Sequence, residues 1–103
     1  MEKICIFRKN NIKVDIIVSN PPYIKEMDNK HVFEEVNKSS MGKKYHDGKM
    51  DFWYYFLHQG IDIKSTNGII SYITPRYWIN SKGALKLIKR VSTELNFIDV
   101  VDI

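Results

Sequence analysis

The stretch that decides the fold is Val14-Asp15-Ile16-Ile17-Val18-Ser19, which runs straight into Asn20-Pro21-Pro22-Tyr23. The run 12–19 is almost continuously apolar and rich in β-branched side chains, as is typical of a strand covered on both faces. Pro21 and Pro22 end this strand, because each ring fixes φ at about −65° and neither residue has an N–H group for a sheet. The stretch 12–23 therefore predicts a buried strand with a rigid loop at its carboxyl end.

The next stretch, residues 24–50, is polar and has only scattered apolar positions. Residues that favour turns recur along it, at Asn29, Asn37, Ser39, Gly42 and Gly48. This composition predicts a flexible loop, and a loop of such length in a compact domain is usually functional. The same stretch is rich in lysines, which are either a solvated surface or contacts for the phosphates of a nucleic acid.

Residues 51–103 predict a helix, a strand, a second helix and a final strand. Asp51 is placed to cap the first helix, whose apolar residues recur with the spacing of one helix face: Phe52, Trp53, Phe56, Leu57, Gly60 and Ile63. Asn67-Gly68 ends this helix, and residues 68–74 form a strand that Pro75 stops.

The second helix begins after Ser81, which is placed to cap it. Its inward positions are Ala84, Ile88, Val91 and Leu95, and its outward positions are Lys82, Lys86 and Lys89. Residues 97–103 predict the final strand, and residues 4–7 are a candidate for a further short strand.

Strands that alternate with helices predict an α/β fold, with a parallel sheet and right-handed crossover helices. Ligands in such sheets bind beyond the carboxyl ends of the strands. The loop 20–23 and the pair Thr74-Pro75 each follow a predicted strand. We therefore expect these two segments to meet at one edge of the sheet and to form the candidate site.

The chain has 103 residues, 44% of them hydrophobic, and a formal net charge of +4. This length fits one domain, 1–103, with a modest core. No segment reaches the ~20 apolar residues of a membrane span and no signal-peptide core is present, so we expect a cytoplasmic protein without a membrane partner. Cys5 and the three histidines have no spacing typical of a metal site, so no metal is expected.

The tetrapeptide Asn20-Pro21-Pro22-Tyr23 resembles the catalytic motif of amino-methyltransferases, in which a strand runs directly into Asn-Pro-Pro-Tyr or Asn-Pro-Pro-Phe. The resemblance implies that the loop holds an exocyclic amino group in line with the methyl group of S-adenosylmethionine. Such a nitrogen is a poor nucleophile because its lone pair is delocalised into the ring, and two fixed acceptors favour its pyramidal form in the transition state. The side-chain oxygen of Asn20 and the carbonyl of Pro21 are suited to this role.

Tyr23 offers a flat ring on which a base turned out of its duplex stacks, and stacking needs the ring but not the hydroxyl. Thr74 and Pro75 match the same family's strand end near the base pocket. The resemblance also implies that Asn20 contributes to binding of the cofactor.

The resemblance extends over residues 15–103. Asp51-Phe52-Trp53, residues 67–75 and Ser81-Lys82-Gly83 look like the modification segment of adenine-specific enzymes from restriction-modification systems, most of all the type IIG kind. It implies the second half of a Rossmann-like, S-adenosylmethionine-dependent methyltransferase core.

Several parts of a complete enzyme have no counterpart in this sequence. They are the glycine-rich cofactor turn, the acidic residue for the ribose, a second aromatic for the flipped base, a target-recognition domain and a nuclease motif. We therefore interpret the chain as part of a catalytic domain, whose partners are double-stranded DNA with a flipped adenine, the missing cofactor-binding half and the recognition domain. The apolar strand 12–19 would then lack a neighbour, which predicts self-association of the isolated chain.

Two other functions remain open from the sequence. Enzymes that methylate the side-chain amide of glutamine in release factors also use Asn-Pro-Pro-Tyr, because that amide has the same delocalised nitrogen. The aromatic helix at 51–57 and the strand end at 73–75 favour adenine in DNA. The third function is that of a non-catalytic remnant that serves as an interaction domain.

Overall fold

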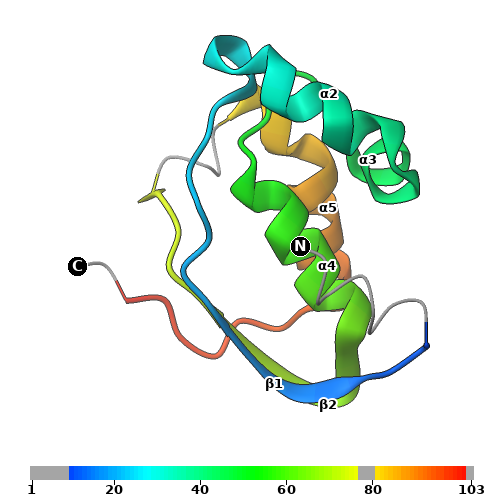
Figure 1. Ribbon diagram of the computed structural model, residues 1–103. Helices are drawn as coiled ribbons and strands as arrows, with labels where there is room; N and C mark the ends of the chain where they lie inside the picture. The colour runs from blue at the N-terminus through cyan, green and yellow to red at the C-terminus, as the bar shows by residue number, and fades with distance from the viewer. Residues whose placement is uncertain (1–9, 77–80, 102–103) are drawn as a thin grey trace.

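The run 14–19 forms strand β1 (Val14–Ser19), which pairs in parallel with β2 (Lys64–Tyr72) (Figure 1). The computed structural model describes residues 10–76 and 81–101, and within them these two strands make up the sheet. Ile16 lies opposite Ile69, and Ser19 lies opposite Tyr72. The predicted α/β fold with a parallel sheet is confirmed for the described residues.

Helix α4 (Trp53–Ile63) precedes β2 and packs against it. The Tyr72 hydroxyl donates a hydrogen bond to the Phe56 carbonyl at 2.8 Å, which fixes the end of β2 on this helix. The predicted helix end at Asn67-Gly68 is wrong, because α4 stops at Ile63 and Lys64 already pairs with Val14. Residues 65–68 instead form an irregular stretch of β2 between the partners of Val14 and Ile16.

The predicted loop over residues 24–50 is wrong as well. The stretch forms a short 3-10 turn, η1 (Glu26–Asp28), and two helices, α2 (Lys30–Lys38) and α3 (Ser40–Tyr45). The Ser39 side chain caps α3 by accepting a hydrogen bond from the Gly42 N–H at 3.0 Å. Four side chains of the stretch are buried, namely Phe33, Met41, Tyr45 and Met50, whereas Met27 is exposed. Phe33 anchors α2 together with the partly buried Val32 and Val36, and Met41 and Tyr45 anchor α3. The many polar residues between these positions hid the helical pattern.

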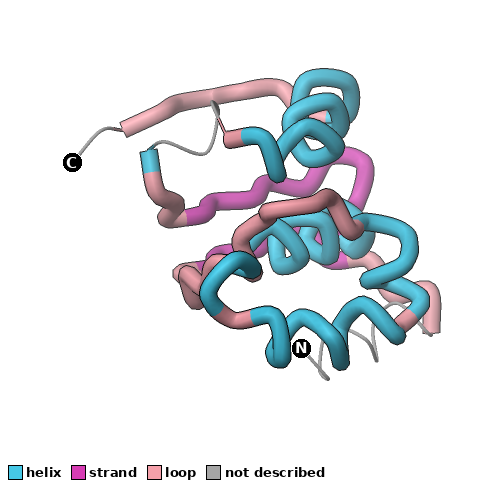
Figure 2. Tube along the Cα trace, turned by 90° about the horizontal axis from the view of Figure 1, so that it is seen from above, coloured by secondary structure: helices cyan, strands magenta, loops and turns pink. Residues whose placement is uncertain are grey.

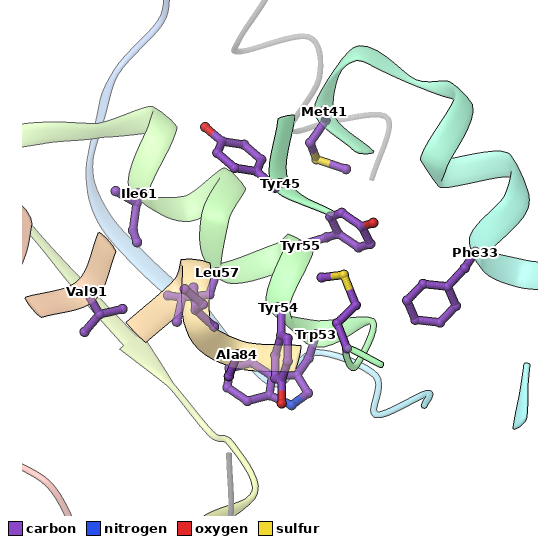
Figure 3. Packing of buried hydrophobic residues seen from close by; sticks show 12 residues of the cluster. Phe33, Met41, Tyr45, Trp53, Tyr54, Tyr55, Leu57, Ile61, Ala84 and Val91 are labelled. Atoms are coloured by element: carbon purple, nitrogen blue, oxygen red, sulfur yellow. The ribbon is translucent and has the colours of Figure 1, made fainter. Parts of the chain in front are cut away.

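The buried side chains of α2, α3, α4 and α5 form one cluster around α4 (Figure 3). The rings of Phe33 and Phe52 meet edge to face with centroids 5.5 Å apart, and Trp53 meets Tyr54 in the same way at 4.7 Å. Trp53 and Leu57 of the predicted apolar face of α4 lie in this core. The opposite, polar side of α4 is buried too. The reason is that the unpredicted helix α3 packs against it.

Helix α5 (Leu85–Glu94) follows one 3-10 turn, η3 (Lys82–Ala84), and runs alongside α4 in Figure 1. Its predicted inward face is confirmed, since Ala84 and Val91 are buried and the remaining positions are partly buried. The predicted cap is wrong in its detail. The Ser81 side chain makes no capping hydrogen bond, and its carbonyl accepts from the Ala84 N–H at 3.2 Å instead.

Two predicted features of the sheet are not found. Residues 97–101 form a loop (Figure 2). They are not a strand, since no described strand pairs with them. Among residues 10–76 and 81–101, the sheet is covered on one face, and the other face exposes Ile16, Val18 and Ile69. The predicted strand 4–7 and residues 102–103 lie outside the described residues. None of the described helices is long and apolar enough to cross a membrane.

Candidate functional site

The candidate site lies where both strands end. The parallel pairing continues one residue past β2, because the Ile73 N–H donates to the Ser19 carbonyl at 3.0 Å. The chain then leaves β1 through the loop 20–23 and leaves β2 through Thr74 and Pro75. These two segments therefore start side by side at the carboxyl edge of the sheet (Figure 1).

Tyr23 links the two segments. Its hydroxyl donates a hydrogen bond to the Ile73 carbonyl at 2.7 Å, and the same oxygen lies 3.4 Å from Oδ1 of Asn20. Tyr23 is 46% exposed and Asn20 is exposed as well. The edge thus presents an amide and an aromatic ring that the fold holds close together and that a ligand can reach.

The remaining predicted residues differ in burial. Pro21 is buried and Pro22 is exposed, while Thr74 and Pro75 are half-buried. Burial fixes Pro21 in the fold, and the ring that follows it disfavours the helical conformation for its backbone. The carbonyl between the two prolines is therefore held in a set position before any ligand arrives.

Asp51 anchors the chain where it leaves the motif loop. Its side chain is almost fully buried, and Oδ1 accepts hydrogen bonds from the Ile24 N–H at 3.0 Å and the Trp53 N–H at 3.4 Å. The Phe52 N–H donates to the Ile24 carbonyl at 2.8 Å, so Ile24 is bonded to the start of α4 on both its backbone groups. The sequence indicated Asp51 as a helix cap, but it could not show the bond to Ile24, which lies 27 residues away.

Burial changes the proton affinity of Asp51. It raises the pKa of the carboxyl, and the hydrogen bonds from the Trp53 and Ile24 N–H groups oppose this rise because they favour the charged form. The two backbone donors need an acceptor oxygen rather than a negative charge. Asp51 therefore holds the loop because its oxygen is in position to accept these two hydrogen bonds.

A second polar cluster lies between α3, α4 and α5, and we call it the Arg90 cluster: Tyr45, His58, Asp62 and Arg90. Asp62 Oδ1 accepts from Arg90 Nη2 at 2.5 Å and from the Tyr45 hydroxyl at 2.6 Å. The rings of Tyr45 and His58 stack with centroids 4.2 Å apart, and Arg90 Nη1 lies 3.3 Å from His58 Nδ1. The cluster joins three helices through partners that the chain itself supplies.

The three histidines have separate surroundings. Burial, followed by the positive charge of Arg90, lowers the pKa of His58 to about 4, so its ring is neutral at pH 7. His46 lies 2.9 Å from Glu26 Oε1, and His31 is exposed on α2. In the part of the chain that the structure describes, no three histidine, cysteine or acidic side chains come together as metal ligands do.

The fold and this edge define the chain as an α/β segment whose candidate site lies beyond the carboxyl ends of two parallel strands. The chain belongs to the Eco57I restriction-modification methylase family, whose model matches residues 2–103. It is similar to the type II methyltransferase M.AccI of Acinetobacter calcoaceticus, with 35% identity over 95 residues. That match covers 87% of this chain but only 17% of the length of the relative. The predicted membership of a restriction-modification methylase family is confirmed.

Proposed function

We propose that this chain is the amino-group-binding segment of a DNA methyltransferase that modifies adenine at its exocyclic nitrogen. The observation that carries the proposal is the loop 20–23 at the carboxyl edge of the sheet, where Asn20 and the half-exposed ring of Tyr23 stand close together. Membership of a restriction-modification methylase family supports DNA as the substrate, and it favours DNA over the amide of a protein glutamine.

In this proposal the residues of the chain act on the nucleophile. Asn20 Oδ1 and the Pro21 carbonyl accept the two N–H groups of the adenine amino group, which directs the nitrogen lone pair out of the plane of the base. S-adenosylmethionine, when bound, supplies the electrophilic methyl group. The nitrogen loses its proton readily once it carries the new bond, so the site needs no strong general base.

Tyr23 supports the base itself. A base that has left the duplex loses its stacking neighbours, and an aromatic ring restores roughly 1–3 kcal/mol of stacking per base. The half-exposed ring of Tyr23 is available for this contact, and Thr74 and Pro75 leave the sheet next to it. The proposed base site therefore comprises Tyr23, Thr74 and Pro75.

The rest of the enzyme would supply what this chain lacks. The chain spans 17% of the length of the relative it matches, and one face of its sheet exposes Ile16, Val18 and Ile69. Exposed apolar side chains on neighbouring strands favour a covering layer. We propose that a cofactor-binding half covers this face and that a separate domain recognises the DNA sequence.

The test is the change Asn20→Ala in the complete methyltransferase. Removal of one acceptor of the transition state typically slows a reaction by about 10²–10³, whereas phosphate contacts elsewhere continue to hold the duplex. We expect the single-turnover rate of methyl transfer to fall by that factor while the Kd for DNA stays within about threefold.

A matched control is Asn67→Ala, since Asn67 is an exposed asparagine toward the other end of β2. This variant should retain the parental rate. A parental rate in Asn20→Ala would contradict the proposal, because the amino group would then be held by another residue.

A further inference from the structure

The hydroxyl of Tyr23 has one proton, and its position can be deduced from distances. The Ile73 carbonyl oxygen lies 2.7 Å away, at the usual length for an O–H···O hydrogen bond. Oδ1 of Asn20 lies farther away, at 3.4 Å, so the Ile73 carbonyl is the nearer of the two acceptors. A carbonyl oxygen can only accept, so the proton of Tyr23 belongs to the bond with Ile73.

The hydroxyl oxygen then has only lone pairs to offer to Asn20. It can pair with a donor, and the amide of Asn20 has its donor on Nδ2 and its acceptor on Oδ1. A half-turn about the terminal bond of the side chain exchanges these two atoms without a change in the space they fill. Hydrogen bonding therefore favours the orientation in which Nδ2 faces Tyr23.

We propose that the Tyr23 hydroxyl is a positioning group that sets the orientation of the Asn20 amide. A chain of hydrogen bonds runs from Asn20 Nδ2 to the Tyr23 oxygen and from the Tyr23 hydroxyl to the Ile73 carbonyl. The chain ends on the backbone of the strand end, which the bond between Ile73 N–H and Ser19 holds in place. Oδ1 of Asn20 is then directed away from Tyr23, which leaves it available to accept from the adenine amino group.

This inference rests on the proposed function and gives the Tyr23 hydroxyl a role that is separate from stacking. In the opposite orientation Asn20 would present an N–H group to the N–H groups of adenine, and two donors cannot pair. Tyr23 thus has two separable parts: the ring contacts the base, and the hydroxyl selects the productive orientation of Asn20. The prediction from sequence that stacking needs only the ring concerns the first part, and the proposed role of the hydroxyl is separate from it.

The experiment is a double-mutant cycle in the complete methyltransferase, with Tyr23→Phe, Asn20→Ala and the double variant. The readouts are the single-turnover rate of methyl transfer and the Kd for a duplex with a fluorescent base analogue at the target position. We expect Tyr23→Phe to slow transfer about 3–10-fold, the range set by one hydrogen bond, while the Kd stays within about twofold. In the Asn20→Ala background the same change should alter the rate by less than about 1.5-fold.

The matched control is Tyr72→Phe. Tyr72 also donates its hydroxyl to a backbone carbonyl, that of Phe56 at 2.8 Å, and it directly precedes Ile73. Loss of this bond should lower the melting temperature and leave the rate of transfer at the parental value.

An equal loss of rate from Tyr23→Phe with and without Asn20 would overturn the inference, because the hydroxyl would then act through the fold alone. A parental rate for Tyr23→Phe would overturn it too, and the proposed function would stand if Asn20→Ala remained slow. A parental rate for Asn20→Ala would overturn both.

Discussion

The sheet edge around Asn20 and the Arg90 cluster both depend on a tyrosine hydroxyl, but they differ in what surrounds it. Tyr23 donates to a backbone carbonyl and is 46% exposed, whereas Tyr45 donates to Asp62 and is 6% exposed. The cluster lowers the pKa of His58 to about 4, and its side chains bind one another, while the edge is open to a ligand. The comparison teaches that shifted pKa values in this cluster accompany structural contacts, whereas the proposed site presents an exposed amide.

The comparison predicts that changes in the Arg90 cluster lower stability without an effect on chemistry. The largest effect is expected for Arg90→Met, because Arg90 and Asp62 retain only 15% and 14% of their side-chain exposure. Loss of one partner leaves the other charge buried, which costs about 3–4 kcal/mol of unfolding free energy. Denaturant unfolding measures this loss.

The control for Arg90→Met is Lys89→Met on the exposed side of the same helix, which should change the unfolding free energy by less than about 0.5 kcal/mol. At concentrations of denaturant where Arg90→Met remains folded, its rate of methyl transfer should match the parent. An Arg90→Met protein with parental stability but slow methyl transfer would contradict the structural role of the Arg90 cluster.

The next effect is a dependence of stability on pH that originates in His58. Its pKa in the folded protein is about 4, below the ordinary value of about 6.5, so the unfolded chain binds more protons between these values. Stability from this group is complete above pH 6.5 and is lost as the pH falls toward 4, by up to roughly 3 kcal/mol. Protonation would place a cation beside Arg90 and Lys86, which the nearby Asp62 and Asp47 offset only in part.

The measurement is the unfolding free energy between pH 7 and pH 4 for the parent and for His58→Gln. The difference between the two proteins should shrink by most of that amount as the pH falls, because glutamine binds no proton. A constant difference across the range would mean that the pKa of His58 is the same in the folded and the unfolded protein.

The smallest stability effect is expected at Asp51, where it is also combined with an effect on the site. Asp51→Ala leaves the Ile24 N–H without its acceptor, which costs about 1–3 kcal/mol and frees the end of the motif loop, so methyl transfer should slow as well.

The matched variant is Asp51→Asn, which retains an acceptor oxygen and removes the charge. Since burial raises the pKa of Asp51, its charged form lowers stability above the ordinary pKa, and the neutral amide should match or exceed the parent at pH 7. A large loss in Asp51→Asn would show that the charge itself is required.

The sequence predicted the parts of this molecule that depend on local pattern. The apolar run 14–19, the aromatic helix that begins near Asp51 and the inward face of α5 all follow from periodicity. The placement of the loop 20–23 beside the end of β2 follows from a general rule, since the ends of adjacent parallel strands share an edge.

The parts that failed depend on contacts between distant residues or on neighbours outside the described chain. The helices α2 and α3 were missed because few of their side chains are fully buried, namely Phe33, Met41 and Tyr45, and such widely spaced apolar positions resemble a loop. The strand at 97–103 was predicted from composition, but a strand requires a partner to pair with. The bonds of Asp51 to Ile24 and of Tyr23 to Ile73 join residues 27 and 50 positions apart, and no local pattern contains them.

The central claim is that this chain positions the amino group of adenine in DNA, and the most direct measurement is the identity of the methylated nucleoside. The complete methyltransferase is incubated with duplex DNA and S-adenosylmethionine labelled in the methyl group, and the DNA is digested to nucleosides for mass spectrometry. We predict that the label appears on the exocyclic nitrogen of deoxyadenosine and that Asn20→Ala slows its appearance by about 10²–10³. Label on cytosine, label on protein alone, or equal labelling by the Asn20→Ala enzyme would contradict the claim.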